Sequence, residues 1–221
     1  WGSPTNDFWC CHGTLVQAHA AYSQWIYYEN DDTIAVCQYI PSVARTQRDG
    51  GEVAIEQTID RQSTGASDDN SSPAGAMHRP THWAVDVRVS CERPLEFTLK
   101  LRVPWWTSPA ATISVNGEPL PAEAVQPGFW TVSRRWHNDN IRVELPKSLT
   151  VSEIPDEPDT VAFLDGPVVL AGLCSTERTL VGDRGDPSSL LAPDNEREWG
   201  TWLQGYRTKG QEQGVRFLPL Y

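Results

Sequence analysis

The chain has 221 residues, enough for one large domain or two small ones, and 39% of them are hydrophobic, which is enough for a buried core. A formal net charge of −11 argues against a nucleic-acid partner, because phosphate binding needs clustered Lys and Arg, whereas uncharged ligands stay compatible. No stretch approaches the roughly 20 apolar residues that cross a bilayer, and the first residues lack the pattern of a signal peptide. We therefore expect no membrane partner and leave the compartment open.

The first predicted element is a helix over Thr14 to Tyr28. Apolar side chains recur there at helical spacing, and several alanines favour the helix intrinsically. Gly13-Thr14 is the predicted cap, with Thr14 as the better capping oxygen. The polar run Glu29-Asn30-Asp31-Asp32 is the predicted end of the helix, because carboxylates are unfavourable near a helix C-terminus.

After this turn the hydrophobic period changes to two, which predicts strands. The first is expected over Thr33–Ile40, closed by Pro41-Ser42, and the second over Glu52–Ile59. Residues 61–81 are rich in Ser, Gly, Asp, Asn and Pro and are expected to form a long loop.

Short strands with turn residues between them continue along the chain. The clearest is Leu95–Val103, where nine residues alternate strictly between apolar and polar. Asn116-Gly117 predicts a tight turn. The other expected strands are His82–Ser90, Thr112–Val115, Phe129–Ser133, Ile141–Leu145, Leu149–Ile154, Val161–Leu164 and Val168–Leu173, the last apolar on both faces as in a central strand. Regular short strands with turns between them predict a mainly β chain, an antiparallel β-sandwich preceded by one helix.

The pattern divides the chain into three parts. Residues 1–32 hold the helix, residues 33–173 the sandwich, and residues 174–221 lose the alternation and stay unassigned. Since the chain begins at Trp1 and its single methionine is Met77, we expect it to be a fragment of a longer protein.

The five cysteines are scattered and odd in number, which does not fit a disulfide framework. Cys37, Cys91 and Cys174 are expected to be small buried hydrophobic side chains. The adjacent pair Cys10-Cys11 is different, because two neighbouring thiols beside a helix start suit metal binding or nucleophilic chemistry. Buried structural thiols or a vicinal disulfide are the alternatives for this pair.

A series of short motifs occurs in a fixed order along the chain. These motifs are Phe8-Trp9-Cys10-Cys11-x-Gly13-Thr14, Ile26-Tyr27, Tyr39-Ile40-Pro41-Ser42, Leu101-Arg102-Val103-Pro104-Trp105, Val115-Asn116-Gly117, Gly128-Phe129-Trp130, Arg135-Trp136 and the apolar run from Val161 to Ala171 around Asp165-Gly166-Pro167. The series resembles the β-L-arabinofuranosidases of glycoside hydrolase family 127 (GH127) and their relatives. The double cysteine followed by Gly-Thr is its most specific part, and the resemblance covers roughly residues 8–173.

The resemblance implies an upstream (α/α)6 barrel, of whose C-terminal end residues 1–32 would be the remainder, followed by the sandwich. It also implies a zinc ion held by one glutamate and three cysteines, with a second glutamate as general acid/base. Carried over by motif, Cys10 is the expected nucleophile and a zinc ligand, and Cys11 is a zinc ligand. The other site residues would lie upstream of residue 1, so this chain alone is expected to be inactive. Gln17 stands where relatives often carry a glutamate.

The chemistry that the resemblance implies is physically coherent. Zinc coordination and a helix N-terminus both favour thiolate, the nucleophilic form of a thiol. A thiolate nucleophile with a carboxyl partner can perform retaining hydrolysis of L-arabinofuranosides or similar plant-type glycans. His12 and His19 are expected to serve as packing or capping residues rather than metal ligands.

Two other functions stay open for the sandwich. It could bind carbohydrate without catalysis, with Trp105, Trp106, Trp130 and Trp136 as the platform. It could also be purely structural and brace the barrel, which we favour because these tryptophans lie beside strands that need core residues.

Overall fold

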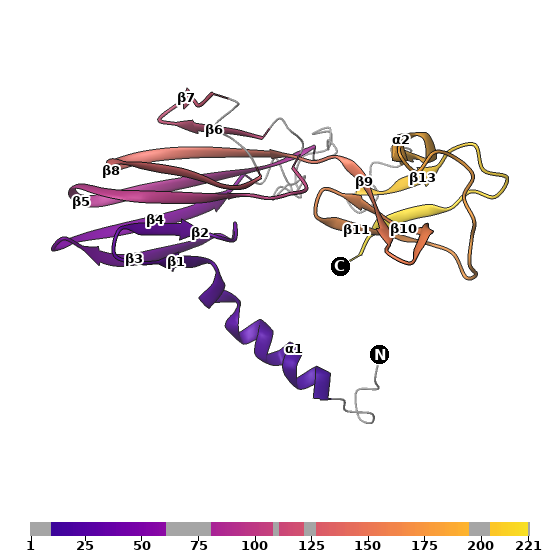
Figure 1. Cartoon of the computed structure of the whole chain (residues 1–221), viewed down its shortest axis with the longest axis horizontal. Coiled ribbons are helices and arrows are strands. Elements are labelled where there is room, and N and C mark those ends of the chain that lie inside the picture. Colours follow the sequence, from indigo (N-terminus) through magenta and orange to yellow (C-terminus); the bar gives the residue numbers. More distant parts are fainter. Residues whose placement is uncertain (1–9, 61–80, 108–110, 122–126, 195–203, 221) are drawn as a thin grey trace, which may run out of the picture.

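The computed structural model describes residues 10–60, 81–107, 111–121, 127–194 and 204–220 (Figure 1). The chain begins with helix α1, Cys10–Ala21, and one 3-10 turn, η1, Tyr22–Trp25. The strands of the first sheet follow as β1 Tyr27–Glu29, β2 Thr33–Val36, β3 Ser42–Arg48, β4 Gly51–Ile59, β5 His82–Val103, β6 Thr112–Val115, β7 Glu118–Pro119 and β8 Gly128–Pro146. The second sheet is built from β9 Leu149–Ile154, β10 Glu157–Asp165, β11 Val168–Gly172, the short helix α2 Pro187–Leu190, β12 Leu191–Pro193, β13 Tyr206–Thr208 and β14 Arg216–Pro219.

Two sheets lie next to each other along the long axis of the molecule (Figure 1). In the described residues the first has eight strands in the order β1-β2-β5-β8-β6-β7, with β4 pairing to both β3 and β5. The second has six, in the order β12-β13-β14-β11-β10-β9. The pairings are antiparallel except that β2 runs parallel to β5. The prediction of a mainly β, antiparallel-rich chain is therefore confirmed.

The first sheet is built on the long hairpin of β5 and β8. The register of this pair shifts between Ser90 and Leu95, which divides each strand into two halves. β4 pairs with the first half of β5, from Val85 to Cys91, whereas β2 pairs with the second half, from Thr98 to Leu101. Alternate residues from both halves are buried in one apolar cluster, so the two halves act as the two layers of a sandwich around it.

Trp136 is a fully buried member of this apolar cluster. Its ring centroid lies 5.9 Å from that of Phe97, and its indole Nε1 donates to the Phe97 carbonyl at 2.9 Å. The Arg134 guanidinium lies over the same ring, 5.1 Å from the centroid. A buried aromatic ring with a satisfied indole N–H provides large apolar contact at no polar cost.

A smaller second core lies within the second sheet. Its buried side chains are Phe163, Leu170, Leu190, Leu191, Tyr206, Val215 and Phe217. β14 pairs with β11, and through β13 it connects to β12. The C-terminal segment that the sequence left unassigned thus supplies strands of this sheet. β11 lies between β10 and β14, the interior position that its apolar sequence predicted.

The helix prediction was wrong at both ends. α1 begins at Cys10, so that Gly13 and Thr14 lie inside the helix rather than at its cap. Tyr27 and Tyr28 belong to strand β1, where they pair with Val36 and Ala35. Aromatic residues favour strands, and the pairing with β2 overrides the helical spacing of the preceding apolar residues.

Strand β3 was missed, and the predicted strand over Thr33–Ile40 is shorter, because β2 ends at Val36. The sequence did carry a signal for the β3–β4 hairpin in Asp49-Gly50. Both residues have positive φ, 49° and 74°, as a tight hairpin turn requires. The same geometry at Asn116 and Gly117, with φ of 54° and 83°, confirms the predicted turn there. The expected loop over 61–81 lies almost wholly outside the described residues.

Candidate functional site

The predicted site residues Cys10 and Cys11 occupy the first turn of α1. Both are free thiols and both are exposed, so neither is a buried structural thiol and they form no vicinal disulfide. Their exposure leaves both thiols accessible to a metal ion or a substrate.

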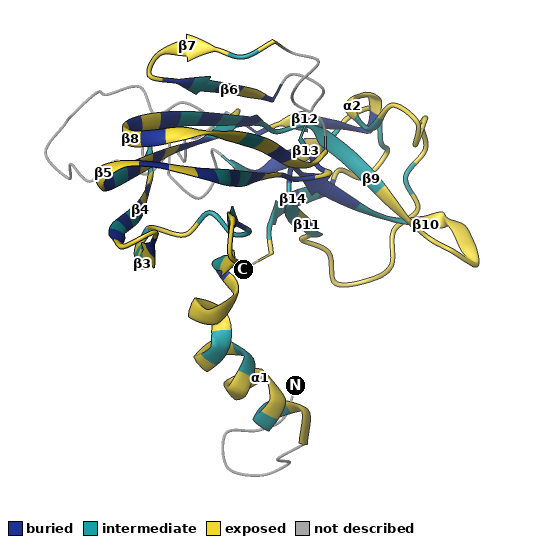
Figure 2. Ribbon diagram, turned by 60° about the vertical axis from the view of Figure 1, so that its left-hand side comes forward, coloured by how far each residue is buried: buried dark blue, intermediate teal, exposed yellow. Residues whose placement is uncertain are grey.

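Most residues of helix α1 are exposed. None of its residues is buried, and it extends away from the first sheet in both views (Figures 1 and 2). Its apolar side chains are included in this exposure: Leu15 is 51% and Val16 69% exposed. The first buried residue after it is Ile26, which joins the helix to β1. Uncovered apolar side chains on a helix are typical of a surface that another part of a protein covers.

The other cysteines are separate from this pair. Cys91 is buried in the first sheet, as predicted, and Cys37 is partly buried. Burial raises the pKa of both thiols, which keeps them neutral and unreactive. The prediction for Cys174 was wrong, because this residue follows β11 at the surface and is exposed. In the part of the chain that the structure describes, no three His, Cys, Asp or Glu side chains are grouped so that they could hold a metal ion.

The four tryptophans of the possible carbohydrate platform do not form one. Trp106, Trp130 and Trp136 are buried in the first core, and Trp105 alone among them is exposed, at 67%. Three of the four are therefore core residues, which is why their sequence positions fall next to alternating strands. The prediction that these four tryptophans form a stacking platform was therefore wrong.

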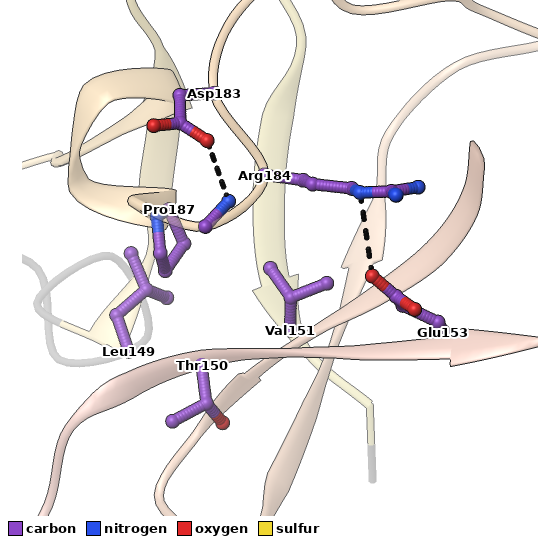
Figure 3. Close-up of a pocket in the computed structure, with 8 residues that line it drawn as sticks. Leu149, Thr150, Val151, Glu153, Asp183, Arg184 and Pro187 are labelled. Atoms are coloured by element: carbon purple, nitrogen blue, oxygen red, sulfur yellow. Dashed lines mark hydrogen bonds and ion pairs between the residues drawn. The ribbon is translucent and has the colours of Figure 1, made fainter. Parts of the chain in front are cut away.

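A groove of about 560 Å³ lies in the second sheet, and the sequence did not predict it (Figure 3). Leu149, Val151 and Pro187 form its apolar floor. At its edge Arg184 Nε lies 3.3 Å from Glu153 Oε1, and Asp183 accepts a hydrogen bond from the Gly185 N–H at 2.8 Å. No thiol or histidine lines the groove, so it offers no nucleophile of the kind that the cysteine pair supplies.

No helix among the described residues is long and apolar enough to span a membrane. A search among curated proteins gives no match to this chain.

Comparison with family models gives one match, over residues 74–147, to the β-L-arabinofuranosidase GH127 middle domain. This stretch contains β5, β6, β7 and β8, and so includes the β5–β8 hairpin on which the first sheet is built. The match thus lies on the residues that determine the fold of the first sheet and does not include α1.

Solved structures resemble the chain over nearly its full length. A GH127 β-L-arabinofuranosidase from Geobacillus stearothermophilus T6 matches at 21% identity and a TM-score of 0.63, covering 99% of this chain and 36% of that one. A second GH127 β-arabinofuranosidase matches at 18% identity and a TM-score of 0.55, covering 88% and 33%. A third structure, named a glycoside hydrolase, matches at 15% identity and a TM-score of 0.58, covering 96% and 37%.

At these identities the structures establish a shared fold, and this chain spans about a third of the length of each. Together with the domain match they confirm the resemblance that the motif series indicated. The chain resembles GH127 β-L-arabinofuranosidases in fold, and its residues 74–147 match the model of the GH127 middle domain.

Proposed function

We propose that this chain is the C-terminal part of a zinc-dependent retaining glycoside hydrolase with a cysteine nucleophile. Its substrates would be L-arabinofuranosides or similar plant-type glycans. The observation that carries the proposal is the pair of exposed free thiols in the first turn of α1, in a chain whose fold is that of GH127 β-L-arabinofuranosidases. The upstream catalytic barrel is the proposed partner of the exposed helix.

The two thiols fit a zinc ion by their chemistry. Zinc prefers thiolate ligands and binds four groups in a tetrahedron. Cys10 and Cys11 could supply two of these, and both are reachable because both are exposed. A third cysteine and a glutamate would have to come from the upstream region, since the described residues hold no larger group of possible ligands. Bound zinc would keep the thiols deprotonated near neutral pH.

Cys10 would perform the substitution at the sugar. Its Sγ attacks the anomeric carbon and displaces the glycosidic oxygen, which takes a proton from the upstream carboxylic acid. The resulting carboxylate then removes a proton from water, and this water displaces Sγ from the anomeric carbon. Two displacements at one carbon retain its configuration. Cys11 would hold the metal and would not form a bond to the sugar.

Serine variants of the full-length protein separate these roles. Cys10→Ser should abolish turnover of an aryl β-L-arabinofuranoside, because a serine hydroxyl stays protonated near neutral pH. Cys11→Ser should chiefly lower the zinc content, measured by elemental analysis. Cys174→Ser is the matched control, because that thiol is also exposed but follows β11 in the second sheet. If Cys10→Ser kept most of the activity while Cys11→Ser lost it, the nucleophile would be the other thiol or neither.

The stereochemistry gives a second test that is independent of zinc. Retaining enzymes transfer the sugar to methanol with the same anomeric configuration, which NMR of the methyl glycoside shows directly. An inverted product would exclude the covalent route through Cys10, whatever the activity of the cysteine variants.

A further inference from the structure

Two polar side chains are almost wholly buried in the sandwich that the two layers of the first sheet form. Arg48, the last residue of β3, is 8% exposed, and Gln57, on β4, is 1% exposed. Both strands belong to the layer that pairs with the first half of β5. Each of these side chains donates hydrogen bonds to the backbone of the opposite layer, at the segments next to the base of α1.

Arg48 holds the turn between β1 and β2. Its guanidinium donates to the carbonyls of Asn30, Asp31 and Thr33 at 2.9, 2.8 and 2.8 Å. The Glu29 carboxylate lies 3.3 Å away, and the group also lies over the Phe97 ring at 5.8 Å. Glu29 is itself exposed, so backbone carbonyls provide most of the compensation for burying this charge.

Gln57 holds the segment that follows β2. Its Nε2 donates to the Gln38 carbonyl at 3.2 Å. The same segment is bonded to the end of the helical region, because Cys37 N and Gln38 N donate to the Ile26 carbonyl at 2.8 and 3.4 Å. Ile26 follows directly on η1, so the chain leaves the helix at the end of the β1–β2 hairpin that Gln57 holds, and Arg48 holds the turn at the other end.

Stability of the core does not explain why these residues are polar. Replacing a buried ion pair and its partner together with apolar groups of similar volume is often neutral or stabilising, so a buried polar contact is weak evidence for a role in stability. Arg48 Nε and Gln57 Oε1 are buried without a hydrogen-bond partner, so each residue also carries an uncompensated polar atom. What the two side chains do add is directional bonding that permits only one arrangement of the β1–β2 hairpin on the opposite layer.

We propose that Arg48 and Gln57 are positioning residues that set the direction in which α1 carries Cys10 away from the sandwich. This rests on the proposed function. Cys10 and Ile26 are sixteen residues apart, which at helical rise is about 24 Å. A tilt of about 2° at the base of such an arm moves its end by about 1 Å. A misplacement of about 1 Å at a reacting group can lower turnover about 100-fold.

The test uses the full-length protein with Arg48→Met, which keeps most of the side-chain volume but removes the fork of donors. We expect kcat on the aryl arabinofuranoside to fall about 100-fold, with KM nearly unchanged. The melting temperature should also fall, because the carbonyls of Asn30, Asp31 and Thr33 lose their donor, so kcat is measured at a temperature at which the variant is folded. Arg45→Met is the matched control. Arg45 is on the same strand, its side chain is 65% exposed, and it pairs with Glu52 at the surface, so its kcat should stay unchanged.

Two further variants keep the inference open to refutation. Gln57→Leu removes the second point of attachment and should lower kcat in the same direction. Arg48→Ala leaves room for free guanidinium, and millimolar guanidinium should restore part of its turnover but none of that lost in Cys10→Ser. A folded Arg48→Met with parental kcat would overturn the positioning role. A parent without glycosidase activity would instead refute the proposed function itself.

Discussion

The stability of the first sandwich should depend strongly on Trp136. This side chain has no exposed surface, and it contributes both a large apolar ring and an indole donor to the Phe97 carbonyl. Removal of a fully buried aromatic side chain costs about 3–5 kcal/mol, because the lost burial is followed by a cavity that the strands fill only in part. Trp136→Ala should lower the free energy of unfolding by that amount.

Trp136→Phe separates the hydrogen bond from the burial. Phenylalanine keeps an aromatic ring next to Phe97 but cannot donate to its carbonyl, so the loss should be about 1.5 kcal/mol. Trp105→Ala is the matched control, because Trp105 is 67% exposed. Its substitution should change stability by no more than about 0.5 kcal/mol.

Urea unfolding followed by far-UV circular dichroism measures these differences, and the midpoint should shift without a change in slope. The reasoning would be refuted if Trp136→Ala cost less than about 1 kcal/mol, or if Trp105→Ala cost as much. Either result would mean that the two halves of β5 and β8 do not enclose a common core.

Further predictions concern the helix, the metal and the pH. Amide exchange should be fast over α1, which buries no residue, and slow over 95–103; equal protection in both would show that the helix is held by this chain alone. The 221-residue chain should not hydrolyse aryl arabinofuranosides, and a chelator should hardly change its melting temperature; a large drop would reveal a complete metal site. Burial raises the pKa of the Cys91 thiol and of the Tyr39 phenol above their ordinary values of 9.0 and 10.0. Both groups are neutral in the folded state, so the stability they contribute is complete below these values and is lost as the pH rises through the raised ones. Unfolding free energy should therefore fall in alkaline solution, and less steeply in Tyr39→Phe, as urea unfolding at several pH values would show.

Alternation predicted the strands best where one face of a strand is buried. The predicted strand Leu95–Val103 lies inside β5 and ends with it at Val103, and every second residue of it is buried. The join between this strand and His82–Ser90 was not predicted, because the intervening Glu92-Arg93-Pro94 is typical of a turn. In the structure β5 continues through this stretch, and the change of register there begins the second layer.

The elements that the sequence missed depend on contacts far along the chain. β3 carries Arg45, Gln47 and Arg48 among its seven residues, so it lacks a clear apolar face. It forms because it pairs with β4 through the Asp49-Gly50 turn. Arg48 likewise gave no signal in the sequence, since its partners are backbone carbonyls at 30–33 and no local pattern marks an arginine as buried.

The residues next to Cys10 and Cys11 in the sequence marked the pair as a candidate site. In the structure, the helix that carries the pair buries none of its residues against the rest of this chain. An isolated helix as short as α1 is marginal in water. The apolar side chains that could stabilise α1 and η1 are uncovered, and full burial of each would contribute about 1.5–3 kcal/mol. If the proposed barrel covers them, the docking that stabilises the helix is the same event that completes the metal site. The sandwich would then contribute no reacting group, and its part in the chemistry would be to hold the C-terminal end of the helical segment and so set the direction of α1.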